Sequence, residues 1–400
     1  MPTNQLSVNH GLMHKINCSL ILSSLRKHPS QTRAKLSKQT GLTRSTISNL
    51  TDELITKNFV HEVGYEPSSG GRRGILLELN PQGGSAIAVK INASSVQCAL
   101  SNFVGEISWH KLIPLTSTKT DYVLDIAKNL IQEAIQQNHN NVPILGIGVG
   151  ATGLISDEGI VIYSKFMDWE NVNFRPDWEN KFNLPVSVDN EVSLAAFGEN
   201  HYGAGMKDSH FIFVEIGYGL GAGVVIDGQL YQGKNGYAGE IGYLMSVQPD
   251  SNGTIQPVSL QSMTNIPRLV QTVERYIQEG VQTQLHQDNL TFETIIKAAH
   301  DNDPVASKAM IELSRYVGIG LANLVNTFDI MTFIIGGELG KQYEPYLETI
   351  IDEMQKHIVW MAHDNVQVRF STLKPDAALM GAVAQVFDDI LKEPSLNVIL

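Results

Sequence analysis

Apolar side chains in residues 32–57 recur at three- and four-residue spacing on both sides of a glycine. Leu36 belongs to the inner face of a first predicted helix, and Gly41 permits a left-handed turn that a side chain would resist. Thr43 is expected to cap a second helix, whose apolar stripe consists of Ile47, Leu50, Leu54 and Ile55. This pattern predicts two short helices joined by a tight turn, which is the layout of a helix-turn-helix.

The opposite face of the second helix is polar. It begins with short hydrogen-bonding side chains and one cation, namely Thr43, Arg44, Ser45, Thr46, Ser48 and Asn49. A helix that enters the major groove needs such groups in its first two turns, where it meets the base edges. We therefore expect these residues to contact DNA.

A predicted β-hairpin follows the second helix. Its strands are residues 59–64 and 74–79, and the loop between them is rich in glycine, serine and proline. Two helices followed by a hairpin form a winged helix-turn-helix. Arg72 and Arg73 stand at the glycine-rich tip, where they are expected to reach a phosphate or a narrow minor groove.

Beyond a turn-rich hinge at residues 80–84, strands and helices alternate. One unit consists of predicted strands at 85–91, 96–103 and 105–112, a helix at 121–137 and a strand at 143–149. A similar plan follows, with strands at 211–216, 221–226, 229–231, 330–335 and 366–371, and helices at 265–279, 291–299, 304–328, 343–362 and 377–392. The chain is thus predicted to be an α/β protein in which a winged head precedes two lobes and a cleft between them. We assign residues 1–80 to the head, 81–198 plus a C-terminal helix at about 377–400 to the first lobe, and 199–376 to the second.

Charge separates the head from the body. Residues 1–75 hold ten Lys or Arg against four Asp or Glu, whereas the whole chain carries −12. A basic head on an acidic body indicates a regulator that touches DNA at one end. No stretch is apolar and long enough to span a membrane, and the two cysteines, Cys18 and Cys98, argue against a disulfide framework. These features predict a cytoplasmic protein.

Several motifs in the body point to one family. They are the glycines at 217, 219, 221 and 223, the segment IDGQLYQGKNGYAGEIGYL at 226–244, VDNE at 188–191 and IIGGELG at 334–340. Together they resemble the ROK family of sugar kinases and transcriptional repressors. With the winged head in front, the chain is similar to the repressor branch, and its head and hinge are most similar to xylose repressors. This resemblance implies an actin-like, two-lobed body with a sugar in the cleft, beside which the kinases bind ATP.

The phosphate-binding motifs of the kinases are not preserved. Kinases of the family place an acidic residue and then a Gly-Gly-Thr turn where this chain has Lys90 and then Asn92, Ala93 and Ser94. Tyr218 stands where the family has threonine in the second phosphate segment. Close approach to a phosphate requires glycine, and magnesium chemistry requires a carboxylate. We therefore predict no kinase activity, no catalytic residue and no cofactor.

The sugar-binding motifs are partly preserved. Asn190 and Glu191 match the family's Asn-acid pair, in which the acid is the kinase base. Glu240 matches the carboxylate of the Glu-x-Gly-His motif, but Tyr243 replaces its histidine, and Gln261 falls near a further sugar-binding glutamate. The resemblance implies that these residues bind an effector sugar.

Two more loops complete the predicted effector site. Thr152 and Gly153 match the loop that lies under the sugar in family members, and Phe166 replaces a common asparagine. Asp168 and Trp169 follow, a carboxylate and an indole that suit a sugar ring or, equally, surface packing. The family's zinc-binding cysteine cluster is absent from residues 245–265, so no metal site is expected.

Three functions fit these observations. The leading hypothesis is a sugar-responsive repressor whose dimer, or tetramer, binds operator DNA and whose effector acts through the hinge on the head. The second is an active sugar kinase with a regulatory head. The third is a repressor that answers to a non-sugar ligand or a protein partner, which the missing zinc cluster, Tyr243 and Gln261 keep open.

Overall fold

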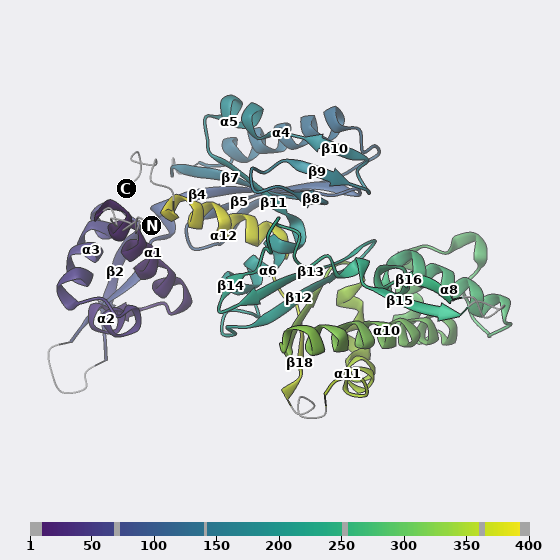
Figure 1. Cartoon of the computed structure of the whole chain (residues 1–400). Helices are drawn as coiled ribbons and strands as arrows, with labels where there is room; N and C mark the ends of the chain where they lie inside the picture. The colour runs from purple at the N-terminus through teal and green to yellow at the C-terminus, as the bar shows by residue number, and fades with distance from the viewer. Residues whose placement is uncertain (1–9, 68–72, 140–141, 250–254, 360–364, 393–400) are drawn as a thin grey trace, which may run out of the picture. The chain divides into compact units, whose positions relative to one another are not determined.

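The structure is a computed structural model that describes residues 10–67, 73–139, 142–249, 255–359 and 365–392. Contacts divide the chain into two compact units, residues 1–194 with 378–400 and residues 195–377. The first unit contains the head and one α/β lobe, and the second contains the other lobe (Figure 1). The corresponding predicted boundary lay between residues 198 and 199.

The head has the predicted winged helix-turn-helix architecture. Its elements are α1 (His10–Lys27), β1 (Gln31–Thr32), α2 (Arg33–Thr40), α3 (Arg44–Thr56), β2 (Val60–Tyr65) and β3 (Ile75–Leu79), with the strands ordered β1-β3-β2. Gly41 has a φ of 73°, as the tight turn requires, and the Thr43 hydroxyl accepts the backbone N–H of Thr46 to cap α3. The core is formed by fully buried aliphatic side chains, among them Ile21, Leu22, Leu36, Ile47, Leu54 and Leu77.

The segment predicted to be a hinge is a packed joint. Residues 81–83 form a short 3-10 helix, η1 (Pro81–Gly83). The Asn80 backbone N–H donates to the Phe59 carbonyl at 2.9 Å, and the Asn80 side-chain amide donates to the Asn58 carbonyl at 2.9 Å. A Cβ on Gly83 would lie 3.0 Å from the Asn58 oxygen, so only glycine permits this close approach without a shift.

Three buried aromatic rings close the joint. The Phe59 ring, which follows α3, lies 5.2 Å from the Phe103 ring, measured between centroids. Phe103 in turn lies 5.0 Å from Phe387 in an edge-to-face arrangement. Phe387 belongs to the C-terminal helix α12 (Ala377–Lys392). The head is therefore held by side-chain packing as well as by the chain connection, at the place where the sequence predicted a turn-rich hinge.

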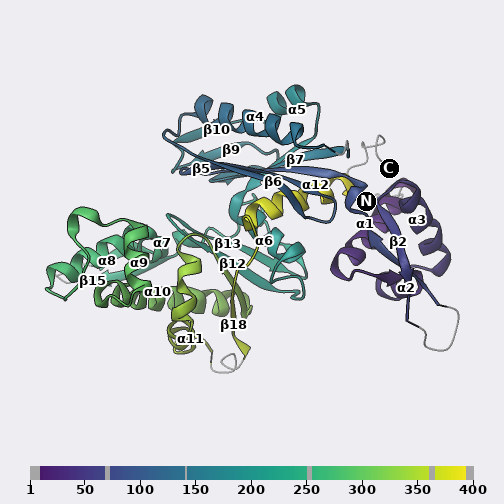
Figure 2. The ribbon, with the colours of Figure 1, turned by 180° about the vertical axis from the view of Figure 1, so that it is seen from behind.

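The first lobe is built on a five-stranded mixed sheet. Its strands are β4 (Ser85–Ile91), β5 (Ser95–Asn102), β6 (Ile107–Pro114), β7 (Ile144–Ala151) and β11 (Val186–Asn190), in the order β11-β7-β4-β5-β6. Helices α4 (Thr120–Gln136) and α5 (Arg175–Phe182) cover one face, and α12 covers the other (Figures 1 and 2). A small sheet of β8 (Leu154–Ile155), β9 (Val161–Ser164) and β10 (Trp169–Val172) was not predicted.

Helix α12 lies against the backbone of its neighbours. A Cβ on Gly148 of β7 would be 2.4 Å from the Ala382 carbonyl oxygen of α12. A Cβ on Gly381 of α12 would be 1.7 Å from the Leu194 carbonyl oxygen of α6 (Glu191–Tyr202). Glycine at both positions therefore lets α12 sit between the sheet and the helix that begins with Glu191.

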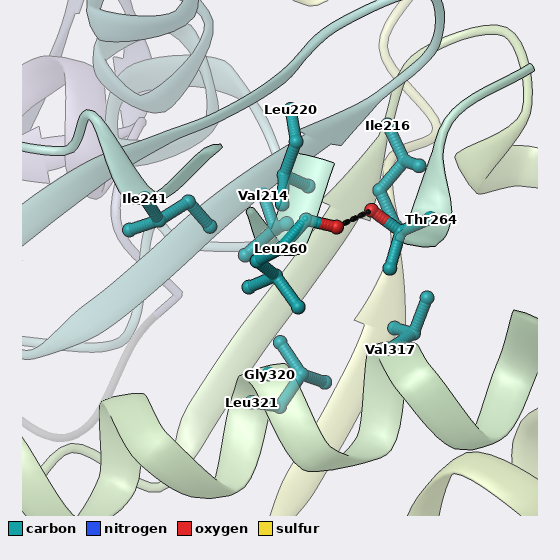
Figure 3. Close-up of a pocket in the computed structure, with 9 residues that line it drawn as sticks. All are labelled: Val214, Ile216, Leu220, Ile241, Leu260, Thr264, Val317, Gly320 and Leu321. Atoms are coloured by element: carbon teal, nitrogen blue, oxygen red, sulfur yellow. Dashed lines mark hydrogen bonds between the residues drawn. The ribbon is translucent and has the colours of Figure 1, made fainter. Parts of the chain in front are cut away.

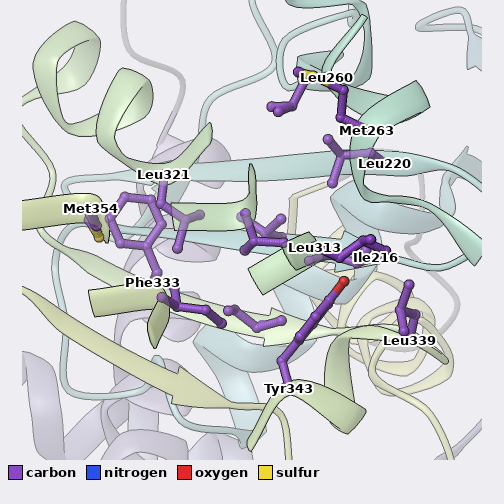
Figure 4. Packing of buried hydrophobic residues seen from close by; sticks show 14 of the residues in the cluster. Ile216, Leu220, Leu260, Met263, Leu313, Leu321, Phe333, Leu339, Tyr343 and Met354 are labelled. Carbon is purple, nitrogen blue, oxygen red and sulfur yellow. The ribbon is translucent and has the colours of Figure 1, made fainter. Parts of the chain in front are cut away.

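The second unit contains a sheet of β12 (Phe211–Ile216), β13 (Leu220–Ile226), β14 (Gln229–Leu230), β17 (Thr332–Gly336) and β18 (Gln367–Phe370), in the order β14-β13-β12-β17-β18. Its helices are α7 (Leu260–Thr264), α8 (Ile266–Gln278), α9 (Phe292–His300), α10 (Pro304–Phe328) and α11 (Leu347–Gln355). The core lies around α10, whose Leu313 and Leu321 belong to one buried cluster with Phe333 of β17 (Figure 4).

Two predictions for the second unit differ from the structure. The helix predicted at residues 343–362 is confirmed only in part, because α11 spans Leu347–Gln355 and the residues before it form the 3-10 helix η4 (Gly340–Tyr346) with Pro345 inside it. Residues 360–362 of that range lie outside the described residues. A hairpin of β15 (Met245–Pro249) and β16 (Ile255–Ser259) also forms where no strand was predicted. In the described parts of the chain, no helix has the length and apolarity to cross a membrane.

Candidate functional site

The first turns of α3 carry the polar face predicted to meet DNA. Arg44, Ser45 and Asn49 are exposed, as is the capping residue Thr43. Thr46 and Ser48 are half-buried. The opposite face is anchored in the head by its apolar stripe and by Thr51, whose side chain is fully buried. The helix thus presents its N-terminal polar side chains outward, as groove recognition requires.

Most charged groups near this face are engaged within the head. Three cations form internal ion pairs, Arg33 with Asp52 at 2.7 Å, Lys35 with Glu66 at 2.6 Å and Lys57 with Glu53 at 2.7 Å. In contrast, Arg44 has no ion-pair partner among the described residues. Arg73 is exposed at the base of the wing loop, and Arg72 lies outside the described residues. Arg44 and Arg73 are therefore the predicted DNA-binding cations that remain available to phosphates or bases.

A buried polar cluster lies in the first lobe. The Lys90 ammonium on β4 is 3.5 Å from Glu191 Oε2, and the two side chains are 6% and 10% exposed. The hydroxyl of Thr152, the residue after β7, donates a hydrogen bond to Glu191 Oε1. The sequence did not predict this pairing. A lysine inside the buried strand β4 was nevertheless a signal, because a buried ammonium requires a carboxylate nearby.

Asn190 organises the backbone beside this cluster. Its side-chain amide donates to the Gly153 carbonyl at 2.8 Å, and its side-chain oxygen accepts the backbone N–H groups of Val192 and Ser193 at the start of α6. Gly153 has a φ of 130°, and a Cβ there would lie 2.5 Å from the Tyr163 carbonyl. Asn190 therefore caps α6 and fixes the loop at Gly153, which leaves one amide hydrogen for a ligand.

The turn at residues 92–95 is filled by its own side chain. The Asn92 side-chain oxygen accepts the backbone N–H of Ser94 at 3.0 Å and of Ser95 at 2.8 Å. In a phosphate-binding turn, such N–H groups would point at the phosphate. With Lys90 in place of a carboxylate, this turn offers neither free amides for a nucleotide phosphate nor a ligand for magnesium. The residues present do not fit a nucleotide.

Glu240 supplies the carboxylate among the residues of the second unit that are predicted to bind the effector. It follows Gly239, where a Cβ would lie 1.8 Å from the Ala222 carbonyl oxygen of β13. The Gly239 carbonyl accepts the Ala222 N–H at 2.8 Å, so this contact fixes where Glu240 begins the 3-10 helix η2 (Ile241–Tyr243). Burial raises the pKa of the Glu240 carboxyl, and no charged neighbour contributes to the shift.

Gln261 and Tyr243 differ in their surroundings. The Gln261 side-chain oxygen accepts the backbone N–H of Leu220 at 3.2 Å, and a Cβ on Gly242 would lie 2.9 Å from that oxygen. The structure therefore places Gln261 beside the Glu240–Tyr243 turn. Tyr243 itself is 66% exposed. The hairpin β15–β16 follows where zinc-binding cysteines occur in the family, and the described residues contain no group of three His, Cys, Asp or Glu that could hold a metal.

The segment at 166–169 divides between surface and core. Asp168 and Phe166 are exposed in the turn between β9 and β10, and Asp168 has a φ of 55°. Trp169 is only 2% exposed, and its indole N–H donates to the Thr118 carbonyl at 2.9 Å. Trp169 is therefore part of the lobe core, and the interpretation of Trp169 as a sugar-facing indole is wrong.

A pocket in the second unit is not suited to a sugar. Its walls are aliphatic side chains of β12, β13, α7 and α10 (Figure 3). Thr264 supplies a hydroxyl group, which donates to the Leu260 carbonyl at 3.0 Å. A sugar needs several convergent polar groups, which these walls do not offer.

Comparison with known proteins identifies the family. A family model described as ROK family matches residues 86–388. The chain belongs to the ROK family. Its relatives include the xylose repressor of Caldicellulosiruptor bescii, 34% identical over 394 residues that cover 96% of this chain and 99% of the relative. The xylose repressor of Bacillus subtilis is 28% identical over 378 residues, which cover 94% of this chain and 96% of the relative.

Solved structures of ROK proteins share the fold. A ROK family transcriptional regulator, a homologue of the E. coli MLC protein, covers 95% of this chain and 98% of its own, with a TM-score of 0.80 and 24% identity. A ROK glucokinase from Streptomyces griseus, in complex with glucose and AMPPNP, covers 76% of this chain and 99% of its own, with a TM-score of 0.63 and 25% identity. The ROK fold therefore occurs in both regulators and kinases.

Proposed function

We propose that this ROK protein is a transcriptional repressor that binds operator DNA and responds to a sugar. The observation that carries the proposal is the outward polar face of α3, with Arg44 unpaired among the described residues, in a winged head before a ROK body. Similarity to xylose repressors over 96% of the chain supports it, and makes xylose the first sugar to test. Action on a bacterial operator would place the protein in the cytoplasm.

The head would bind DNA through two elements. Residues Thr43 to Asn49 of α3 would read the major groove, and Arg73, with Arg72, would hold the backbone or the minor groove. Two heads on a homodimer, or on a dimer within a tetramer, would match a pseudo-palindromic operator. Arg44 is the only Lys or Arg of α3, so it would carry the positive charge that this helix brings to the groove.

The proposed effector-binding residues are Gly153, Asp168, Asn190 and Glu191 in the first unit, and Glu240, Tyr243 and Gln261 in the second. Glu191 and Glu240 can accept hydrogen bonds from sugar hydroxyls, whereas the amides of Asn190 and Gln261 can donate them. Binding of effector and operator would then be reciprocally coupled.

A repressor without phosphotransfer fits the first lobe better than a kinase. The ammonium of Lys90 neutralises Glu191, the residue at the position of the kinase base. Asn92 uses the backbone N–H groups that would hold a phosphate. We therefore propose that the protein is not an enzyme.

The test measures DNA binding by fluorescence anisotropy, with a duplex selected from a random library by the wild-type protein. We expect D-xylose, or another sugar of a pentose and hexose panel, to lower the affinity for that duplex. Arg44→Ala should lower it by about 10–100-fold without sugar. Lys111→Ala is the matched control, because Lys111 pairs with Glu133 on the surface of the first lobe. The proposal would be contradicted if no sugar of the panel changed the affinity for the duplex, or if Arg44→Ala left that affinity unchanged.

A further inference from the structure

The buried pair of Lys90 and Glu191 raises the question of what a lysine contributes to a sugar-binding site. The two groups come from separate elements, β4 and the first turn of α6, and both side chains are almost fully buried. Burying two charges costs free energy, and a well-packed apolar pair is often more stable. Stability alone therefore does not explain the pair, whereas a requirement for a charged carboxylate at residue 191 does.

We propose that Lys90 is a positioning residue for the effector, which holds the Glu191 carboxylate charged and oriented to accept hydrogen bonds from the hydroxyls of an uncharged sugar. This inference rests on the proposed function. The Thr152 hydroxyl donates to Oε1, and the Lys90 ammonium lies 3.5 Å from Oε2 without a hydrogen bond to it, so each oxygen has a donor or a cation beside it. A carboxylate offers roughly four acceptor positions in all.

A nearby carboxylate shows what burial does without an ammonium. Asp189 lies two residues before Glu191, at the end of β11, and burial raises its pKa to about 6. Asp157 adds a smaller repulsive contribution in the same direction. Such a group gains a proton as the pH falls through about 6. At Glu191 the Lys90 ammonium counteracts this effect, because an opposite charge within a few ångströms favours the ionised form of a carboxyl group.

The same pair selects the chemical class of effector. Its net charge is zero, and the ammonium already faces a carboxylate. A sugar phosphate would bring about two negative charges beside Glu191 without a new cation to balance them. The pair therefore favours a free sugar over its phosphate. Hydroxyl groups of a free sugar donate hydrogen bonds to a charged carboxylate, and such bonds are stronger than neutral ones.

The experiment compares two substitutions of Lys90 in the full-length protein. Lys90→Met keeps the length of the side chain and removes its charge, whereas Lys90→Arg keeps the charge. Lys111→Met is the matched control, because Lys111 and Glu133 form a pair at 2.7 Å with side chains 43% and 42% exposed. Titration calorimetry with D-xylose and D-xylose 5-phosphate at pH 5.5 and pH 8 supplies the readout.

We expect Lys90→Met to weaken D-xylose binding about 10-fold or more at pH 8, as the loss of a charge-assisted contact implies. The loss should grow at pH 5.5, because a buried carboxylate gains a proton more readily when the opposite charge beside it is removed. Titration of Asp189 and Glu240 is common to both proteins and cancels in the ratio of their affinities. Lys90→Arg should retain most of the binding, Lys111→Met should bind as the wild type, and the phosphate should bind more weakly than the free sugar.

Equal affinity of Lys90→Met and the wild type for D-xylose at both pH values would overturn the proposal. If Lys90→Met does not fold, the double variant Lys90→Met with Glu191→Gln replaces the ion pair by a neutral pair. We expect it to fold and to bind D-xylose weakly, and binding as in the wild type would show that Lys90 serves stability alone. A wild-type protein that binds no sugar of the panel would overturn the proposed function together with this inference.

Discussion

Glu191 and Glu240 are two carboxylates in regions with different electrostatics. Glu191, in the first unit, is buried with an ammonium at 3.5 Å and a hydroxyl donor. Glu240, in the second unit, is raised in pKa by burial alone. The difference shows two ways to prepare an acceptor. Glu191 has partners within the protein, whereas the proposed ligand would supply the partner that Glu240 lacks among the described residues.

The largest expected effect is on stability. Glu191→Leu removes one member of a buried ion pair and takes this carboxylate away from the buried Lys90 ammonium. We expect a loss of about 3–5 kcal/mol in the free energy of unfolding, measured by urea denaturation. Glu240→Leu should cost far less, because it removes a charge that has no ionic partner. Equal losses for the two variants would contradict the distinction between the carboxylates.

A smaller effect is expected on sugar affinity. Glu240→Gln keeps the shape of the side chain and removes its charge, so hydrogen bonds from sugar hydroxyls weaken. We expect D-xylose to bind about 10–100-fold more weakly by calorimetry, as for the loss of a hydrogen bond to a charged group. Glu293→Gln, an exposed acid in the first turn of α9, is the control. Unchanged affinity of Glu240→Gln would remove Glu240 from the effector site.

The smallest effect is on the pH dependence of stability. The pKa of Glu240 is higher in the folded state than in the unfolded chain, so folding is relatively favoured at low pH and this advantage is lost as pH rises through the folded pKa. Glu240→Gln should therefore unfold about 1–2 °C above the wild type at pH 8 and at the same temperature at pH 4. Thermal unfolding at both pH values tests this expectation. If the two unfolding temperatures still differed at pH 4, the difference would have a cause other than the titration of Glu240.

Features encoded by neighbouring residues could be predicted from the sequence. The Gly41 turn, the Thr43 cap and the apolar stripe of α3 depend on contacts within a few residues, so their pattern is visible locally. The same holds for the alternation of strands and helices in the body. The helix predicted at 343–362 was too long, because the prediction gave more weight to the apolar periodicity than to Pro345. In the structure the segment divides into η4, which contains Pro345, and α11.

Features that join distant segments could not be predicted in detail. Lys90 and Glu191 lie on separate elements, and no local pattern says which carboxylate a buried lysine meets. The role of Trp169 could not be decided from the sequence for the same reason. Only the tertiary structure shows that its indole N–H donates to the Thr118 carbonyl. The joint at residues 80–84 was interpreted from its Pro and Gly residues as a hinge, whereas its packing depends on Phe103 and Phe387 from other parts of the chain.

The aromatic joint has a consequence for exchanging DNA specificity between repressors. The Phe103 ring touches Phe59 on one side and Phe387 on the other, so a head grafted from another protein would have to bring a side chain of similar shape. A chimaera without that match would leave a void or expose Phe103 to water. The head of this protein is thus not an independent module. The shape of the first lobe around Phe103 limits which heads can be joined to it.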